Sequence, residues 1–299
     1  MLVPAKSREF WLTHRGESVR DWLDQLPRLS TQLMARWSCV PAGDVRAGYG
    51  GVVVPVRRGD GTRAVLKMSL PSEEDDFEST VLDAWGGRGA VLLLERDDGL
   101  GARLLENLED RSLAELEDAE VSMAIVGSLV HRLAVPAPEG LPRLSEAYGQ
   151  WALQLPDMNR VCGRALPDRT VAAAVASCRD LGAEQPDTVL HGDLHQNNVL
   201  RGTREEWLAI DPLGVVGDLA SECLTHLRDR WVELQRQDQP ERALRRRIDV
   251  FADAAHIDRE RAHRWTQLRA TVTILRTPVD IGPLNDGGLH AWVATALTD

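Results

Sequence analysis

Hydrophobic residues recur every three or four positions through much of the chain, which is the spacing of amphipathic helices. Near the amino terminus this spacing predicts a short helical pair between Glu17 and Cys39. Pro27 is expected to break it, because proline removes a helix hydrogen bond and clashes with the preceding turn. The same period predicts helices farther along, at 169–181, 219–235, 243–255, 259–275 and 289–297.

Short apolar runs separated by turn residues predict strands between Gly48 and Glu106. Residues 52–56 and 64–68 flank an Asp-Gly turn, and residues 90–95 and 102–106 flank a second one. Pro55 cannot donate to a strand ladder, so its strand is expected at an edge or with a bulge. Between the two pairs, a helix is expected from Ser72 through Trp85, closed by two glycines.

The strand pattern stops after Asn107. Residues 112–115 have the spacing of a capping box, which predicts the start of a long helix toward Leu133. A proline-rich connector follows at 136–142. We therefore expect an α+β, two-lobed fold, with a strand-rich lobe at 1–107 that carries a helical extension and a helical lobe at 108–299.

The net charge and the composition disfavour nucleic acid and membranes as binding partners. The chain has 299 residues, 35 basic against 46 acidic side chains and a formal charge of -11. An acidic surface repels nucleic acid and anionic lipid, and no apolar run approaches the ~20 residues that span a bilayer. The amino-terminal sequence has no signal-like stretch, so we expect a cytoplasmic protein with neither nucleic-acid nor membrane partners.

Two residue types are used sparingly. The four cysteines have no ligand-like spacing, which indicates buried thiols rather than disulfides or a zinc site. Lys6 and Lys67 are the only lysines, and every other basic side chain is an arginine. A lone lysine in a predicted strand indicates a need for a compact ammonium group, so Lys67 is a candidate functional residue.

The densest polar cluster is the stretch VLHGDLHQNNVL at 189–200. Asp193 and Asn198 lie five residues apart, and a second carboxylate, Asp211, follows an apolar run. One carboxylate can accept a hydroxyl proton while an amide oxygen and a second carboxylate hold Mg²⁺ on nucleotide phosphates. That division of labour predicts phosphoryl transfer.

The segment HGDLHQNN resembles the catalytic loop of the protein-kinase-like fold in the variant used by aminoglycoside phosphotransferases. AVLKM, FESTVLDAWGGRGAVLLLE and WLAIDPLGVVGDLASE are similar to the streptomycin and hydroxyurea kinase branch of that family. The resemblance implies a two-lobed kinase-like fold that uses ATP and Mg²⁺. It implies that Asp193 is the catalytic base and that Asn198 and Asp211 are the metal ligands.

The resemblance also implies a nucleotide site. Lys67 would pair with the phosphates and Glu78 would orient it. The glycine-rich loop at Gly48 would cover the phosphates, although it departs from the full G-x-G-x-x-G pattern. Backbone groups of Glu106 and Leu108 would meet the adenine edge.

Other functions stay open at this point. His191, Asp193 and His195 alternate in a pattern that could hold a transition metal in a hydrolase, but Asn198 and Lys67 would then have no role. A nucleotide-binding regulator without catalysis is a further alternative. A protein kinase is disfavoured, because no Asp-Phe-Gly and Ala-Pro-Glu signatures bracket an activation segment after the catalytic loop, where Ile210-Asp211-Pro212 stands instead. Asp218 is interpreted as a loop anchor or, equally, as a plain helix cap.

The acceptor is expected to be a cationic small molecule. Glu222, Asp229 and Glu233 are seven and four residues apart, which would place them on one helix face beside the catalytic segment. The alternative is a solvated face neutralised by neighbouring arginines. We thus expect an ATP-dependent kinase that phosphorylates a hydroxyl of a streptomycin-like aminoglycoside, or alternatively hydroxyurea or another small metabolite. The sequence leaves the oligomeric state and the choice between ATP and GTP open.

Overall fold

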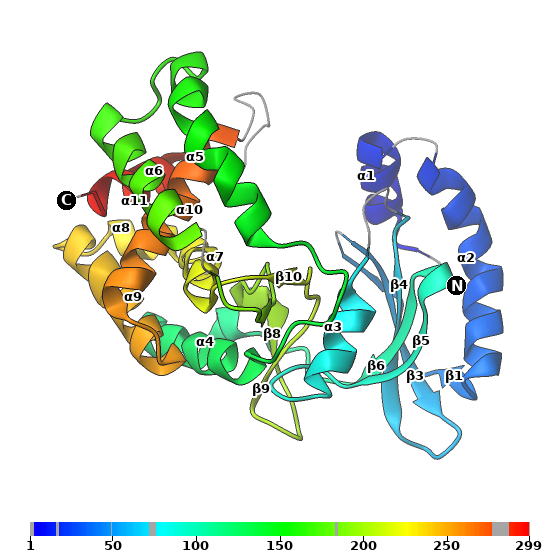
Figure 1. The fold of residues 1–299 in the computed structure, drawn as a ribbon. Helices are drawn as coiled ribbons and strands as arrows, with labels where there is room; N and C mark the ends of the chain where they lie inside the picture. The colour runs from blue at the N-terminus through cyan, green and yellow to red at the C-terminus, as the bar shows by residue number, and fades with distance from the viewer. Residues whose placement is uncertain are drawn as a thin grey trace. The chain divides into compact units, whose positions relative to one another are not determined.

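A computed structural model describes residues 3–15, 18–48, 50–71, 76–182, 185–276 and 287–298. The chain forms two compact units (Figure 1). The first comprises residues 1–109 with 202–204, and the second comprises 110–201 with 205–299. The junction lies two residues beyond the expected one, and the inclusion of 202–204 in the first unit has no counterpart in the sequence pattern.

The first unit is built on one antiparallel sheet with the strand order β1-β3-β4-β6-β5, and β2 pairs with β3. The expected strand pairs are present as β3 with β4 and β5 with β6. The strands are β1 (Cys39–Pro41), β2 (Arg46–Ala47), β3 (Gly51–Arg58), β4 (Arg63–Ser69), β5 (Leu93–Asp97) and β6 (Ala102–Glu106).

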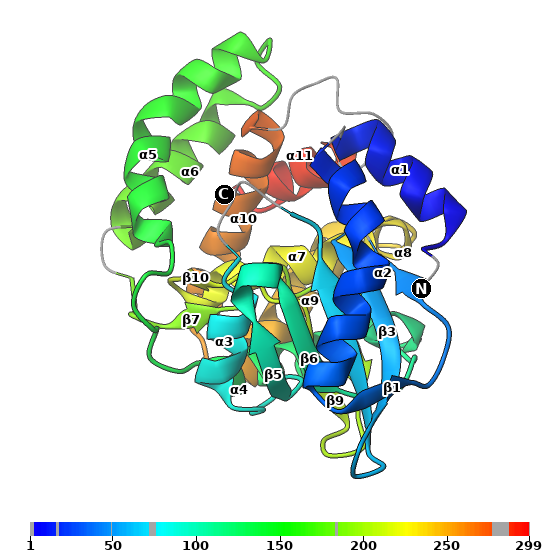
Figure 2. The ribbon, with the colours of Figure 1, turned by 90° about the vertical axis from the view of Figure 1, so that its right-hand side faces the viewer.

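Side chains alternate between the two faces of this sheet. Val54, Leu66 and Leu104 point to a hydrophobic core shared with helices α1 (Ala5–Arg15) and α2 (Ser18–Arg36). Helix α3 (Glu78–Trp85) lies on the opposite face of the sheet, as Figures 1 and 2 show. The residues between these core positions, Lys67 among them, therefore face α3.

The break expected at Pro27 does not occur, since α2 continues through it. The hydroxyls of Ser30 and Thr31 donate to the Pro27 carbonyl at 3.0 and 2.9 Å. Leu26 and Leu33 are buried against the sheet. Burial of each such side chain contributes about 1.5–3 kcal/mol, so two or more offset the ~3 kcal/mol that an internal proline costs.

Pro55 lies inside the sheet rather than at its edge. The Pro55 carbonyl accepts the Ala42 backbone N–H at 2.8 Å. Because the N and O of one strand residue point to the same edge, the Pro55 nitrogen also faces the segment that contains Ala42. On that side the pairing is interrupted between Pro41 of β1 and Arg46 of β2. The missing donor therefore falls where no ladder bond is required.

Helix α3 begins at Glu78 and ends at Trp85, and the next residue, Gly86, has the left-handed φ of 54° typical of a glycine after a helix. The expected end is thus confirmed. The expected start at Ser72 lies outside the described residues. In the same unit, Arg204 donates to the carbonyls of Gly87 and Ala90 at 2.6 and 2.8 Å, which attaches the segment 202–204 to the turn after α3.

The second unit is largely helical, and the helices expected from the sequence pattern are present except where noted below. The described helices are α4 (Ala119–Leu133), α5 (Leu144–Val161), α6 (Asp168–Gly182), α7 (Cys223–Arg228), α8 (Trp231–Gln235), α9 (Pro240–Ala255), α10 (Arg259–Arg276) and α11 (Gly287–Ala296).

Three details of this unit differ from expectation. The single helix expected at 219–235 is divided into a 3₁₀ turn (Leu219–Glu222), α7 and α8, because the backbone leaves the helical conformation at Arg230. The capping box of Ser112 and Glu115 forms, but it begins only a 3₁₀ turn, and α4 starts later with Asp118 as its cap. Helix α5 was not expected. Its buried positions, Leu144, Tyr148 and Leu155, do follow a helical spacing, but Pro156 lies inside it.

Two short ladders complete the second unit. Strand β7 (Val189–Leu190) pairs with β10 (Val215–Val216), and β8 (Val199–Arg201) pairs with β9 (Trp207–Ala209). Among the described residues, no helix is both long and apolar enough to cross a membrane. All four cysteines are free thiols, three of them buried.

Gly127 and Gly149 test the helical packing of the second unit. A Cβ on Gly127 of α4 would lie 2.5 Å from the Phe251 carbonyl oxygen of α9, whereas one on Gly149 of α5 would meet nothing within 4 Å. Gly127→Ala should therefore destabilise the protein by roughly 1–3 kcal/mol, and Gly149→Ala should stabilise it by roughly 0.5–1 kcal/mol. Urea unfolding curves of the two variants measure both changes, and equal midpoints would contradict this packing.

Candidate active site

The stretch 191–198 connects two ladders, because β7 ends at Leu190 and β8 begins at Val199. His191 holds its first part. Its Nδ1 accepts the Asp193 backbone N–H at 3.2 Å, and its Nε2 donates to the Ile210 carbonyl at 2.8 Å. Both ring nitrogens are thus committed to shaping the loop around Asp193.

Asn198 and Asp211 are brought together by the pairing of β8 with β9. Val199 lies opposite Ala209, and the Ile210 N–H donates to the Asn198 carbonyl at 2.9 Å. The Asn198 side-chain Nδ2 donates to the Asp193 carbonyl at 2.9 Å, which turns its amide oxygen the other way. Asp211 follows at the end of the ladder with a left-handed φ of 58°.

Oxygen ligands of this kind fit Mg²⁺. An amide oxygen and a carboxylate are the hard ligands that this ion prefers, and it usually keeps several waters besides one or two protein ligands. The hydrogen bond from the Asn198 side-chain nitrogen to the Asp193 carbonyl orients the side-chain oxygen. The Asp211 side chain is exposed. The two residues can therefore hold a metal that also contacts phosphates.

Asp193 stands in a strongly charged neighbourhood. Burial raises the pKa of its carboxyl above the ordinary value, against the opposite effects of His195 and Arg228 and with the repulsion of Asp229 and Asp211. The carboxylate is 37% exposed, and His195 Nε2 lies 3.7 Å from its Oδ2. A partly exposed carboxylate with a raised proton affinity suits a general base.

Two carboxylates support the loop through its backbone. Glu222 Oε1 accepts the Gly192 N–H at 2.9 Å, and Asp229 Oδ2 accepts the Gln196 N–H at 2.8 Å. Gly192 itself has a φ of 85°, and a Cβ there would lie 3.2 Å from the Leu213 side chain, so glycine is needed at this position. Gly192 directly precedes Asp193, and Gln196 lies two residues before Asn198, so both bonds act close to the functional side chains.

The three acidic residues expected to form one row do not do so. Glu222 is only 4% exposed and lies beneath the loop. Glu233 pairs with Arg230 at 3.2 Å and with Arg247 at 2.5 Å. Asp229 remains near His195, with 4.0 Å between its Oδ2 and the ring Nδ1.

The competing metal-hydrolase arrangement lacks its ligands. Both His191 nitrogens are engaged, and His195 Nδ1 accepts the Asn197 N–H at 3.2 Å. Across the described residues, no group of three His, Cys, Asp or Glu side chains converges on a metal position. The alternation of histidines around Asp193 therefore organises a loop.

Asp218 combines the two interpretations offered for it. Its Oδ1 accepts the Ala220 N–H at 3.0 Å as a helix cap. Its Oδ2 accepts from the Trp265 indole at 2.7 Å and pairs with Arg261, both on α10. It thus attaches the segment after β10 to α10.

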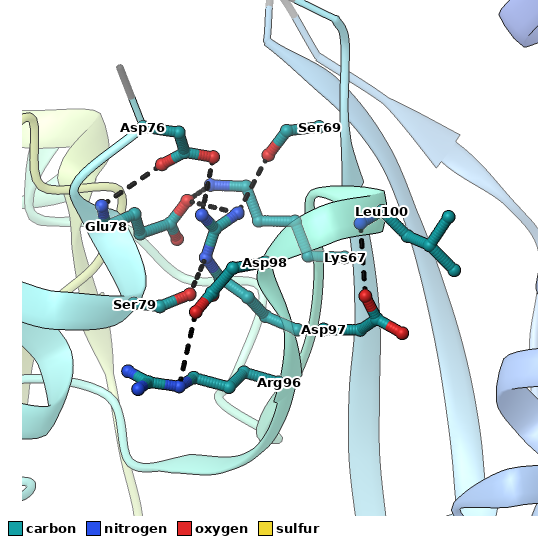
Figure 3. Close-up of polar contacts among 10 residues, drawn as sticks. Lys67, Ser69, Asp76, Glu78, Ser79, Arg96, Asp97, Asp98 and Leu100 are labelled. Atoms are coloured by element: carbon teal, nitrogen blue, oxygen red, sulfur yellow. Dashed lines mark hydrogen bonds and ion pairs between the residues drawn. The ribbon is translucent and has the colours of Figure 1, made fainter.

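The first unit carries the expected lysine and glutamate pair. Lys67 Nζ donates to Glu78 Oε2 at 2.7 Å, and both side chains are buried (Figure 3). Strand β4 supplies the lysine and α3 supplies the glutamate. The choice of Glu78 among several acidic residues in this segment is consistent with this contact.

The other expected nucleotide contacts are backbone positions. The Gly48 N–H donates to the Gly51 carbonyl at 3.0 Å and closes the turn between β2 and β3, while the glycine that is sterically required is Gly51. The Glu106 carboxylate accepts from Arg204 at 3.0 Å and from the Leu92 N–H at 3.1 Å. Its side chain therefore holds the connection at the end of β6, next to Leu108.

The fold and the site define a small-molecule kinase of the protein-kinase-like fold. The family described as aminoglycoside/hydroxyurea antibiotic resistance kinase matches residues 36–278. The chain belongs to this family. The resemblance inferred from the catalytic segment is thereby confirmed.

Individual relatives agree with this membership. The chain is 40% identical to streptomycin 6-kinase of Streptomyces griseus over 274 residues, 89% of this chain and 88% of that one. It is 37% identical to hydroxyurea phosphotransferase of Kitasatospora aureofaciens over 268 residues, 88% and 76% of the two chains. Its fold resembles that of an amicoumacin kinase, with a TM-score of 0.58 at 13% identity over 90% and 93% of the two chains.

The supporting roles of Glu222 and Arg230 had no detectable sequence signal, although Glu222 was expected to contact the acceptor. Glu222 acts on Gly192 from 30 residues away, and Arg230 donates to Gln196 Oε1 at 3.2 Å from 34 residues away. Arg230 also donates to the Glu117 carbonyl at 2.8 Å. Such contacts depend on the tertiary fold, because no helix or strand repeat in the sequence relates residues that are 30 or 34 positions apart.

Glu222 gives a pH-dependent prediction. Burial raises the pKa of its carboxyl to about 7, from an ordinary value of 4.5. Between these values the unfolded chain is ionised while the folded protein keeps the proton, so the free energy of unfolding should fall as pH rises, by roughly 3 kcal/mol in total. Below pH 4.5 both states are protonated, and above pH 7 both are ionised.

The variant Glu222→Gln keeps an acceptor for the Gly192 N–H and lacks the titrating proton. Its stability relative to the unsubstituted protein should therefore increase from pH 4.5 to 7 and then remain constant. Urea unfolding at a series of pH values measures this difference. Parallel stability curves for the two proteins would show that folding does not raise the pKa of Glu222.

Proposed function

We propose that this chain transfers the γ-phosphoryl group of ATP, with Mg²⁺, to a hydroxyl of a streptomycin-like aminoglycoside. The observation that carries the proposal is the convergence of Asp193, Asn198 and Asp211 in one unit of a chain that belongs to this kinase family. The 40% identity to a streptomycin 6-kinase supports the acceptor class. A hydroxyurea phosphotransferase at 37% identity makes hydroxyurea the second candidate.

In this proposal the carboxylate of Asp193 accepts the proton of the attacking hydroxyl. The hydroxyl oxygen forms the new bond to phosphorus as the bond to the β-phosphate oxygen breaks. Asn198 and Asp211 would hold Mg²⁺, which supplies positive charge to the phosphate oxygens. The amicoumacin kinase was solved with AMP-PNP and Ca²⁺, which supports a nucleotide with a divalent cation in this fold.

The first unit is proposed as the nucleotide-binding lobe and the second as the catalytic and acceptor-binding lobe. Lys67 would contact the phosphates and Glu78 would orient it. The loop at Gly48 would cover the phosphates, and backbone groups from Glu106 to Leu108 would meet the adenine. The buried Lys67 and Glu78 pair supports this placement.

Substitutions at Asp193 and Asp211 should separate catalysis from metal binding. Asp193→Asn should reduce turnover by roughly 10²–10⁴ and keep nucleotide affinity, because a general base acts mainly in the transition state. Asp211→Ala should lower both turnover and the affinity for ATP in the presence of Mg²⁺. Release of ADP with streptomycin or hydroxyurea as acceptor measures turnover, and ATP titrations with Mg²⁺ or EDTA measure binding.

Each result has a clear contrary outcome. Near-normal turnover of Asp193→Asn at saturating substrate would remove the base assignment. Unchanged affinity for the magnesium nucleotide in Asp211→Ala would place the metal elsewhere. Turnover of hydroxyurea without turnover of streptomycin would select the second candidate function.

The proposal of a cationic acceptor rests on one acidic residue, Asp229, and no longer on a row of three. Glu222 is buried beneath the loop and Glu233 is paired with Arg247, whereas Asp229, although it accepts the Gln196 N–H, lies beside Asp193. A guanidinium group and the net charge of -11 would favour each other electrostatically. The Michaelis constant for streptomycin should then rise with ionic strength, and less steeply in Asp229→Asn. A Michaelis constant for streptomycin that changes neither with ionic strength nor in Asp229→Asn would contradict the cationic contact.

A further inference from the structure

Arg103 is a buried cation that the proposed reaction does not use directly. It lies on β6 and is 1% exposed. In the register of β4 with β6 it stands opposite Lys67. Two like charges opposite each other on neighbouring strands are destabilising unless anions lie between them.

The guanidinium of Arg103 uses every nitrogen. Its Nε donates to Ser79 Oγ at 2.9 Å, and its Nη1 donates to Ser69 Oγ at 2.9 Å. Its Nη2 donates to Asp76 Oδ2 at 2.5 Å. These partners come from β4, from α3 and from the residues just before α3 (Figure 3).

Arg103 also shares a carboxylate with Lys67. Its Nη1 lies 3.2 Å from Glu78 Oε2, the same oxygen that accepts from Lys67 Nζ at 2.7 Å. Asp76 Oδ1 accepts the Glu78 N–H at 3.1 Å, so Arg103 reaches Glu78 through both its side chain and its backbone. The group of Lys67, Arg103, Glu78 and Asp76 has two positive and two negative charges.

Charge keeps this group together. Burial lowers the pKa of Arg103, but Glu78 and Asp76 reverse this and hold it above the ordinary value. Burial also raises the pKa of Asp76, whereas the hydrogen bond and charge of Arg103 bring it below the ordinary value. Both side chains are therefore ionised at neutral pH.

We propose that Arg103 is a positioning residue that fixes the Glu78 carboxylate, and through it the Lys67 ammonium, for contact with nucleotide phosphates. The proposal rests on the proposed role of Lys67 in ATP binding. Glu78 lies on the first turn of a helix, and its side chain has several rotatable bonds, each with more than one staggered rotamer. Arg103 removes that freedom with a planar, multiply bonded group.

The shared oxygen has a second consequence. Lys67 and Arg103 contact the same oxygen of Glu78, so the position of that oxygen also sets the position of the ammonium. The Lys67 ammonium has three donors, so it can keep its bond to Glu78 and still donate to a phosphate. Arg103 thus holds Lys67 in place without neutralising it.

Kinetics of Arg103 variants test this role. Arg103→Met keeps the apolar stem and removes the charge and all donors, so the Michaelis constant for ATP should rise by roughly tenfold or more. The Michaelis constant for the acceptor should stay constant. Arg103→Lys keeps the charge without the planar fork, and its constant for ATP should be intermediate.

Arg96→Met is the matched control. Arg96 also links the sheet to α3, through Asp83 at 2.5 Å, but it is 42% exposed and outside the Lys67 group (Figure 3). Its loss should leave the constant for ATP unchanged. An equal rise of the Michaelis constant for ATP in Arg96→Met and Arg103→Met would overturn the proposal. A lower kcat of Arg103→Met with an unchanged Michaelis constant for ATP would also overturn it, because partial unfolding removes active enzyme without changing affinity.

The scarcity of lysine gives an independent readout. In a Lys6→Arg background, Lys67 is the only side-chain amine in the chain. Its acylation by an amine-reactive ester, followed by peptide mass spectrometry, should be roughly tenfold faster in Arg103→Met than with Arg103 present, since the Glu78 carboxylate is then no longer fixed and the ammonium leaves it more often. Equal rates would overturn the proposal.

Milder variants cover the case in which Arg103→Met does not fold. Asp76→Asn keeps the oxygen that accepts from Glu78 and removes the charge, and Ser79→Ala removes one bond to Arg103. Both should raise the Michaelis constant for ATP and the labelling rate by smaller factors, and no change in either quantity would overturn the proposal. The labelling needs no nucleotide, so it tests the role of Arg103 separately from the proposed function. The proposed function fails instead if Lys67→Ala binds ATP normally or if no acceptor is phosphorylated.

Discussion

The candidate catalytic centre depends on the backbone hydrogen bonds of the segment that returns from β9. The Ile210 N–H donates to the Asn198 carbonyl at 2.9 Å, and the Leu213 N–H donates to the His191 carbonyl at 2.8 Å. One short segment thus fixes both ends of the loop that carries Asp193. Asp211 lies between these two bonds, and the left-handed backbone, which costs about 1–2 kcal/mol for a residue other than glycine, persists because both sides are held.

Features that follow local rules could be predicted from the sequence, and features that follow tertiary packing could not. The spacing of Asp193 and Asn198 and the strand lysine Lys67 have local patterns, and the structure brings the first two together through one hydrogen bond. Helix α2 continues through Pro27 because burial against the sheet outweighs local preference. The acidic row failed because α7 and α8 are separate helices, so a single period does not run from Glu222 to Glu233.

Buried charge is managed in two different ways in the two units. Around Arg103 each buried charge has an opposite partner and directed hydrogen bonds, which is the condition under which burial of ions is tolerated. Glu222 has one hydrogen bond from Gly192, and its second oxygen has no hydrogen-bond partner. Its raised pKa follows directly, because the neutral acid is cheaper to bury than the carboxylate.

The segment that follows β10 supports the loop and also supplies the charges near it. Glu222 and Asp229 both accept backbone N–H groups of the loop, while Asp229 and Arg228 also act electrostatically on Asp193. A substitution at Asp229 therefore changes the loop backbone and the field at once, which is why the isosteric Asn is the informative replacement there. Discrimination between a cationic and a neutral acceptor depends on carboxylates whose charge is not closely paired with an arginine inside the fold. By this criterion Glu233, which is paired with Arg247, contributes less than its place in the sequence indicates.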